Sequence, residues 1–170
     1  KGTTEQIYKD YIQKLREVIS DPKGDIQKTL QQMVKDFSMI EKTKNKKPLI
    51  GIVGEIFVRS NRFSNENLIK KLENLGAEVY LSPVDEWLYY INYVSLRKAL
   101  NRRDFYQVLQ FLLKSYYQHK VAKRYEKIFN HILKTAQEPT TKEILQKALP
   151  YLHPSFEGEA VLSIGKAIDM

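Results

Sequence analysis

Two short apolar segments, separated by one helix-length stretch, constrain the fold of this chain most. Residues 49–54 form a continuous, β-branched apolar run, typical of a strand that is buried on both faces. Residues 77–81 form a second run, and the stretch 65–75 between them has helical spacing, with Ser64 as its expected N-cap. Gly76 follows at the position where a left-handed residue ends a helix. The order predicts a βαβ unit with two parallel strands, a Rossmann-like sheet fragment.

Helical patterns fill most of the remaining sequence. Helices are expected at about 4–20, 25–42, 83–100, 104–135 and 141–149, and a last one begins near Gly158. Ser82 is the expected N-cap and Pro83 the expected first residue of the helix 83–100. Thr140 with Glu143 forms a capping-box pattern at the start of the helix 141–149. The apolar stripe of 104–135 repeats every four residues and would drift around a straight helix, which predicts a bend or a break near 115–120.

These patterns together predict a helix-dominated α/β fold with three regions. Residues 1–46 form an N-terminal helical hairpin, 47–96 the βαβ core, and 97–170 a large helical insertion, all within one domain. The chain begins at Lys1 and ends at Met170 inside an apolar helical pattern, and two strands make a poor sheet alone, so we expect a piece of a longer protein. The longest apolar run, 49–58, is too short to span a bilayer.

The positive charge of the chain is concentrated in one region. The whole chain has a net charge of +8, and residues 97–135 carry ten basic and two acidic side chains, which equals that excess. Such a region attracts phosphates, nucleic acid or an acidic partner, or it is simply a solvated helical face. The tyrosines interleaved with it keep the spacing of core residues, so nucleic-acid binding is not expected.

The loop after the first strand is the strongest candidate for a ligand site. Ligands of open α/β sheets bind beyond the carboxyl ends of parallel strands, and helix N-termini and arginine side chains suit anions. The spacing of Gly51 and Gly54 is not that of a dinucleotide-binding or P-loop fingerprint. A structural turn in which Glu55 pairs with an arginine remains an equal alternative. The candidate residues of this loop are Gly54, Glu55, Arg59, Asn61, Arg62, Ser64 and Asn65.

A second polar loop, 153–159, precedes the last helix. Glu157 and Glu159 suit the N-terminal end of the helix dipole, and we expect the two loops to converge at one end of the sheet. His153 with the two glutamates could imitate a metal site, but the loop has no second histidine and the chain has no cysteine, so no metal ligand set is predicted. No complete catalytic set is present in the sequence.

Several long stretches resemble a known family. Residues 47–59, 63–65, 72–87 and 153–169 are similar to the dehydratase-like part of the 2-hydroxyacyl-CoA dehydratase system, whose relatives include the CoA-substrate-specific enzyme activases. The resemblance covers roughly residues 40–170. Its motif residues in this sequence are Gly54, Glu55, Arg59, Ser64, Asn65, Glu157 and Glu159.

The resemblance implies a cytoplasmic protein of an ATP-dependent iron–sulfur system. This piece would be a Rossmann-like scaffold lining a substrate or cluster cleft, with an ATPase activase component, acyl-CoA and the remaining domains of the same polypeptide as partners. A [4Fe–4S] cluster would be held by cysteines elsewhere, because this chain has none. The alternative function is a non-catalytic interaction module that uses region 97–135 to bind an acidic partner or nucleic acid.

Overall fold

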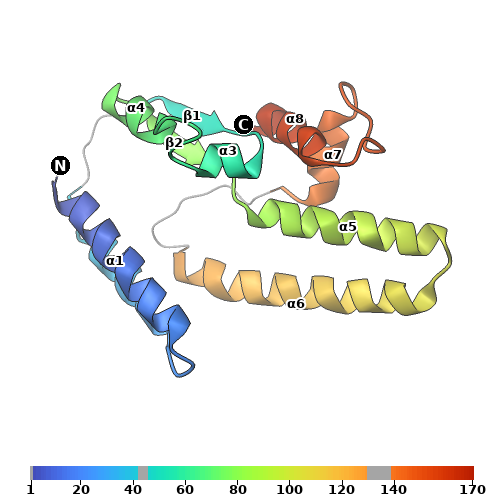
Figure 1. Ribbon diagram of the computed structural model, residues 1–170, viewed down its shortest axis with the longest axis horizontal. Helices are drawn as coiled ribbons and strands as arrows, with labels where there is room; N and C mark the ends of the chain where they lie inside the picture. Colours follow the sequence, from blue (N-terminus) through green and yellow to red (C-terminus); the bar gives the residue numbers. More distant parts are fainter. Residues whose placement is uncertain (1, 42–45, 130–138) are drawn as a thin grey trace. The chain divides into compact units, whose positions relative to one another are not determined.

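The computed structural model describes residues 2–41, 46–129 and 139–170. Within these residues the chain forms eight helices and one two-stranded parallel sheet (Figure 1). The helix-dominated α/β class predicted from the sequence is confirmed. The centre of the expected polar link after residue 41 and the end of the expected helix 104–135, with His131, lie outside the described residues.

The fold separates into two compact units. One unit comprises residues 1–44 and 116–137, and the other residues 45–115 and 138–170. The helix α6 (Phe105–Phe129) is continuous and contributes to both units. Among the described residues no helix is long and apolar enough to cross a membrane.

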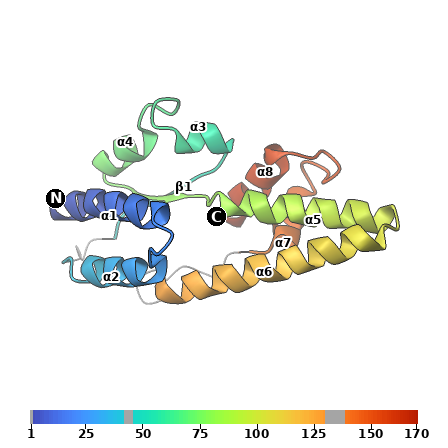
Figure 2. The same cartoon turned by 60° about the horizontal axis from the view of Figure 1, so that its bottom comes forward.

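The first unit contains the predicted helical hairpin. Helices α1 (Gly2–Ser20) and α2 (Ile26–Ser38) lie side by side (Figure 2) and are joined by a turn over 21–25. Asp25 caps α2 by accepting a hydrogen bond from the Lys28 backbone N–H at 2.9 Å. The Tyr11 hydroxyl, buried between the helices, donates a hydrogen bond to the Asp36 carboxylate. This contact ties α1 to α2.

The second unit is built around the predicted βαβ arrangement. Strands β1 (Leu49–Ile52) and β2 (Glu78–Leu81) pair in parallel, with Ile50 opposite Val79. The ladder continues one residue further, because the Ser82 N–H donates to the Ile52 carbonyl at 3.1 Å. Gly76, with a φ of 97°, ends the intervening helix in the left-handed conformation that the sequence predicted.

Burial of β1 on both faces was a wrong prediction. Leu49 is 69% exposed and Ile50 is also exposed, so that Ile52 is the buried residue of the strand. The apolar character of the run is real, but two strands cannot cover each other's faces, and within the described residues no element covers the start of β1.

The connection between the strands also differs from the prediction. A short helix, α3 (Ile56–Ser60), replaces the expected loop, because the Glu55 carboxylate accepts from the Val58 N–H at 2.7 Å and caps it. Helix α4 (Leu68–Asn74) begins later than expected. Its N-cap is Asn67 in a left-handed conformation rather than Ser64. The two left-handed residues, Glu66 and Asn67, delay the start of the helix.

Helix α5 (Asp85–Asn101) follows β2 and leads into α6 through a tight turn. Ser82 is not its N-cap, which is Val84; the Ser82 hydroxyl instead donates to Glu86 within the first turn of α5. The sequence predicted a bend or a break near 115–120, and there is no break, since α6 is one continuous helix. The stripe that motivated the bend includes Phe105, Leu109 and Leu113, which are exposed, so packing does not hold that stripe on one face.

Helices α7 (Thr141–Ala148) and α8 (Glu159–Asp169) pack closely and carry most of the core of this unit. The capping box of Thr140 and Glu143 is confirmed. Gly158, with a φ of 128°, is the N-cap of α8, where a helix was expected to begin. The close approach of α7 and α8 occurs at Gly165, where an added Cβ would lie 2.2 Å from the Ile144 carbonyl oxygen. The buried residues of this core are Tyr90, Ile144, Leu145, Ala148, Val161 and Leu162.

Candidate functional site

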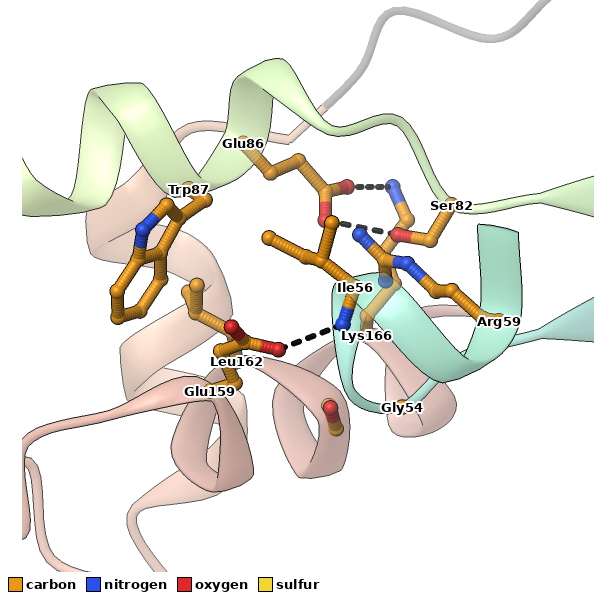
Figure 3. Close-up of a pocket in the computed structure, with 10 residues that line it drawn as sticks. Gly54, Ile56, Arg59, Ser82, Glu86, Trp87, Glu159, Leu162 and Lys166 are labelled. Carbon is orange, nitrogen blue, oxygen red and sulfur yellow. Dashed lines mark hydrogen bonds and ion pairs between the residues drawn. The ribbon is translucent and has the colours of Figure 1, made fainter. Parts of the chain in front are cut away.

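A pocket lies beyond the carboxyl ends of β1 and β2, in the second unit. The empty space there, about 250 Å³, includes open solvent at its mouth, so the part enclosed by the protein is much smaller than this figure. Three segments form it: the loop and helix after β1, the residues after β2, and one side of α8 (Figure 3). Its lining residues are Gly54, Ile56, Arg59, Ser82, Glu86, Trp87, Glu159, Leu162, Ser163 and Lys166.

The two loops that the sequence singled out do meet here. The Glu159 carboxylate, from the first residue of α8, accepts a hydrogen bond from the Ile56 N–H at 2.7 Å. This bond gives α3 a second N-terminal partner besides Glu55 and fixes α8 against the end of β1. Gly54, with a φ of 131°, makes the sharp exit from the strand that lets α3 turn toward α8.

Arg59 is the most unusual group of the pocket. It is only 8% exposed, yet its guanidinium makes one hydrogen bond, from Nη2 to the Pro83 carbonyl at 3.2 Å. Its Nε–H is buried and has no acceptor in the described part of the chain, where no carboxylate lies within ion-pair distance of the group either. The buried Nε–H without an acceptor is costly, since an unsatisfied buried donor costs about 1–3 kcal/mol.

A buried ion pair also lines the pocket. Lys166 Nζ lies 3.0 Å from Glu86 Oε1, and the Ser82 hydroxyl donates to Glu86 Oε2 at 2.8 Å. The Lys166 ammonium also lies over the ring of Tyr80, 5.6 Å from its centroid. Both oxygens of Glu86 are therefore engaged by groups other than Arg59.

The predicted site residues divide between the pocket and local structure. Gly54, Arg59 and Glu159 line the pocket. Glu55 caps α3, and Asn61 Oδ1 accepts from the Phe63 and Ser64 N–H groups at 2.9 and 3.1 Å. Thus Glu55 and Asn61 serve the backbone of their own loop.

The remaining candidates lie away from the pocket lining. Asn65 Nδ2 donates to the Arg59 carbonyl at 2.8 Å and holds the end of α3. Ser64 is exposed. Glu157 is exposed and pairs with Lys98 at 2.7 Å. Arg62, the other arginine of the loop, is exposed as well.

Sequence reasoning missed the pocket residues contributed by β2, α5 and α8. Ser82 follows β2 directly, so the rule that drew attention to the residues after β1 applied to it equally. Lys166 carried a different signal, because it follows Gly165 on the apolar side of a helix with Val161 and Leu162. A lysine at that spacing indicates a buried charge that needs a partner.

Within the described residues no group of three His, Asp or Glu side chains is placed to hold a metal ion.

Comparison with known proteins corrects the family and the functions inferred from the sequence. The chain matches, over residues 3–160, the family described as "Protein of unknown function (DUF1800)". No curated protein and no solved structure is detectably similar to it. The assignment to the 2-hydroxyacyl-CoA dehydratase and activase system is therefore wrong, because a different family spans nearly the whole chain.

Neither function assigned from the sequence follows from this match. The sequence suggested two specific functions. One was a scaffold lining an iron–sulfur or acyl-CoA cleft, and the other was an interaction module using region 97–135. The matching family is described as having unknown function and supports neither. The iron–sulfur cluster loses its only basis with the resemblance, and the chain has no cysteine to ligate one. Since the match covers most of the sequence, the chain belongs to the DUF1800 family of proteins of unknown function.

Proposed function

We propose that this domain binds a small anion, a carboxylate or phosphate group, in the pocket at the carboxyl ends of β1 and β2. The observation that carries the proposal is the buried Arg59 guanidinium, which lines the pocket and has a donor without an acceptor. An arginine fork matches the two oxygens of a carboxylate or phosphate, and such charge-assisted bonds are the strong ones.

The pairing of the charged groups in the pocket supports an external anion at Arg59. Of its two carboxylates, Glu86 is held by Lys166 and Ser82, and Glu159 is held by the Ile56 N–H. A positive charge on Arg59 thus has no internal counterion among the described residues, and desolvating such a charge is expensive. A bound anion would supply both the missing charge and the missing acceptors.

The position of the pocket supports the same proposal. In open α/β sheets, ligands bind outside the carboxyl ends of the strands. Gly54 lies two residues after β1 and Ser82 directly follows β2, and both line the pocket. The small volume suits a ligand of few atoms, or one acidic group of a larger ligand.

The single tryptophan of the chain provides the test, because Trp87 lines the pocket. Its fluorescence is followed while sodium acetate or inorganic phosphate is added at constant ionic strength, with sodium chloride as the reference. Saturable binding of at least one of the two anions is expected, and R59Q should weaken it at least about tenfold through the loss of charge-assisted hydrogen bonds.

Two further variants make the result interpretable. R59K keeps the charge but loses the fork, so intermediate affinity is expected. R62Q removes the exposed arginine of the same loop and should bind as the unmodified chain does. Absence of saturable binding, or equal affinity in R59Q and in the unmodified chain, would overturn the proposal.

A further inference from the structure

The pocket contains an unpaired negative charge as well as an unpaired positive one. Glu159 lines the same pocket as Arg59, and its carboxylate accepts one hydrogen bond, from the Ile56 N–H. Across the described parts of the chain no lysine, arginine or histidine lies within ion-pair distance of Glu159. The helix N-termini at which Glu159 lies stabilise its carboxylate in part, but among the described residues no cationic side chain pairs with it, so an ammonium group of a ligand can still do so.

The two charges enter the pocket from different elements. Arg59 comes from α3 and Glu159 from the first turn of α8. Figure 3 shows the Glu159 carboxylate on the side of Trp87 and Arg59 on the side of Ser82. The groups are not within ion-pair distance of each other, although both line one small pocket. A ligand in this pocket therefore meets a cationic end and an anionic end.

Trp87 adds a second attraction for a cation at the anionic end. Its indole ring lines the pocket and is stacked on the Tyr90 ring, with the centroids 5.2 Å apart, which holds the ring in place. Tryptophan is the aromatic side chain that attracts ammonium groups most strongly. A carboxylate beside an indole is a suitable environment for an ammonium group in a pocket partly closed to water.

We propose that the ligand of this pocket is a small zwitterion of the amino-acid class, with its carboxylate bound by Arg59 and its ammonium group bound by Glu159 and Trp87. The proposal rests on the anion site proposed above and names its ligand class. A simple carboxylate leaves the Glu159 charge unmatched, and a simple amine leaves Arg59 unmatched. A ligand that leaves one of these desolvated charges without a partner binds more weakly, and this difference in affinity gives the selectivity.

The test compares ligands before it compares variants. Glycine, β-alanine and 4-aminobutyrate, whose charges are separated by increasing lengths of chain, are titrated against acetate and methylamine, with Trp87 fluorescence as the readout. At least one of the three zwitterions should bind about tenfold or more tightly than acetate and methylamine, as expected for one additional charge-assisted interaction. This comparison uses the unmodified chain and does not depend on the folding of any variant.

The variants then assign the two ends of the ligand. E159Q keeps an oxygen that can accept from the Ile56 N–H, so α3 stays capped while the charge is lost. It should reduce zwitterion affinity to that of acetate and leave acetate binding undiminished. E157Q is the matched control, because Glu157 is two residues away, pairs with Lys98 and does not line the pocket. It should change neither affinity.

The two proposals fail in different ways. Acetate binding that depends on Arg59, with no zwitterion binding more tightly or with zwitterion binding unaffected by E159Q, overturns the zwitterion and retains the anion site. Absence of saturable acetate and phosphate binding, or anion binding that R59Q does not weaken, overturns the anion site itself and the zwitterion proposal with it.

Discussion

Lys166 and Glu86 form a buried ion pair, with Nζ 3.0 Å from Oε1 and the lysine side chain only 3% exposed. The pair joins α8 to α5 beside the Ser82 hydroxyl, which also bonds to Glu86. The pair therefore connects the two walls of the pocket that α5 and α8 contribute. Its disruption should affect both the stability of the second unit and the pocket.

K166M tests the stabilising role of this pair. The substitution leaves the Glu86 carboxylate partly buried with the Ser82 hydroxyl as its remaining partner, and should lower the free energy of unfolding by about 3 kcal/mol. Adding E86Q removes the uncompensated charge, so K166M/E86Q should recover part of this loss. Urea unfolding followed by Trp87 fluorescence measures both. Equal stability of K166M and the unmodified chain would show that the pair contributes nothing.

G165A tests the packing of α7 against α8. An added Cβ would lie 2.2 Å from the Ile144 carbonyl oxygen and 2.7 Å from Ile144 Cγ2, so the helices must move apart. Overpacking of this kind costs about 1–3 kcal/mol. In a helix whose surface is open, the same change would stabilise by about 1 kcal/mol, because alanine has the higher helix propensity. The sign of the change in the urea midpoint therefore decides whether the close contact exists.

The Tyr11–Asp36 contact gives the helical hairpin a pH dependence. The hydrogen bond from Tyr11 lowers the pKa of Asp36 below its usual 3.8, so this contribution to stability is present above about pH 4 and is lost as the pH falls further. Burial, with the bond to Asp36, raises the pKa of Tyr11 from 10.0 to about 12. The folded hairpin thus retains the neutral phenol, and its contribution is lost as the pH rises from 10 toward 12.

NMR titration of the tyrosine Cζ resonances measures this effect. One resonance should have a midpoint near pH 12, and Y11F should remove that resonance and shrink the acid-side loss of hairpin stability. Y8F is the control, because Tyr8 lies on the same helix and is more exposed. A Tyr11 midpoint at its ordinary value would contradict the buried contact.

Local patterns predicted the elements that local physics determines. The two apolar runs predicted the parallel strands β1 and β2, though not their register, and Thr140 with Glu143 predicted the start of α7. The capping box and the left-handed Gly76 each depend on residues a few positions apart. In such cases the sequence contains the whole interaction.

The errors arose where the deciding contact came from elsewhere in the chain. Helix α3 is short and is stabilised in part by Glu159, which is 103 residues from its partner Ile56. Predicting the pocket required placing Lys166 beside Arg59, and no spacing in the sequence relates these two residues. The bend expected in α6 assumed a buried stripe, whereas Leu109 and Leu113 are exposed. The family resemblance was drawn from long stretches rather than from ligand residues, and the DUF1800 match replaces it.

The most direct test of the anion site observes the Arg59 Nε–H itself. In a ¹⁵N-labelled chain, the R59K variant identifies its NMR cross-peak by the loss of that peak. On titration with acetate, or with the zwitterion that binds most tightly, the account predicts a saturable shift of the Arg59 peak and slower exchange with water, as its unpaired donor gains an acceptor. The Arg62 cross-peak should stay in place. An Arg59 peak that does not move at ligand concentrations saturating the Trp87 signal would contradict the assignment of Arg59 as the anion receptor.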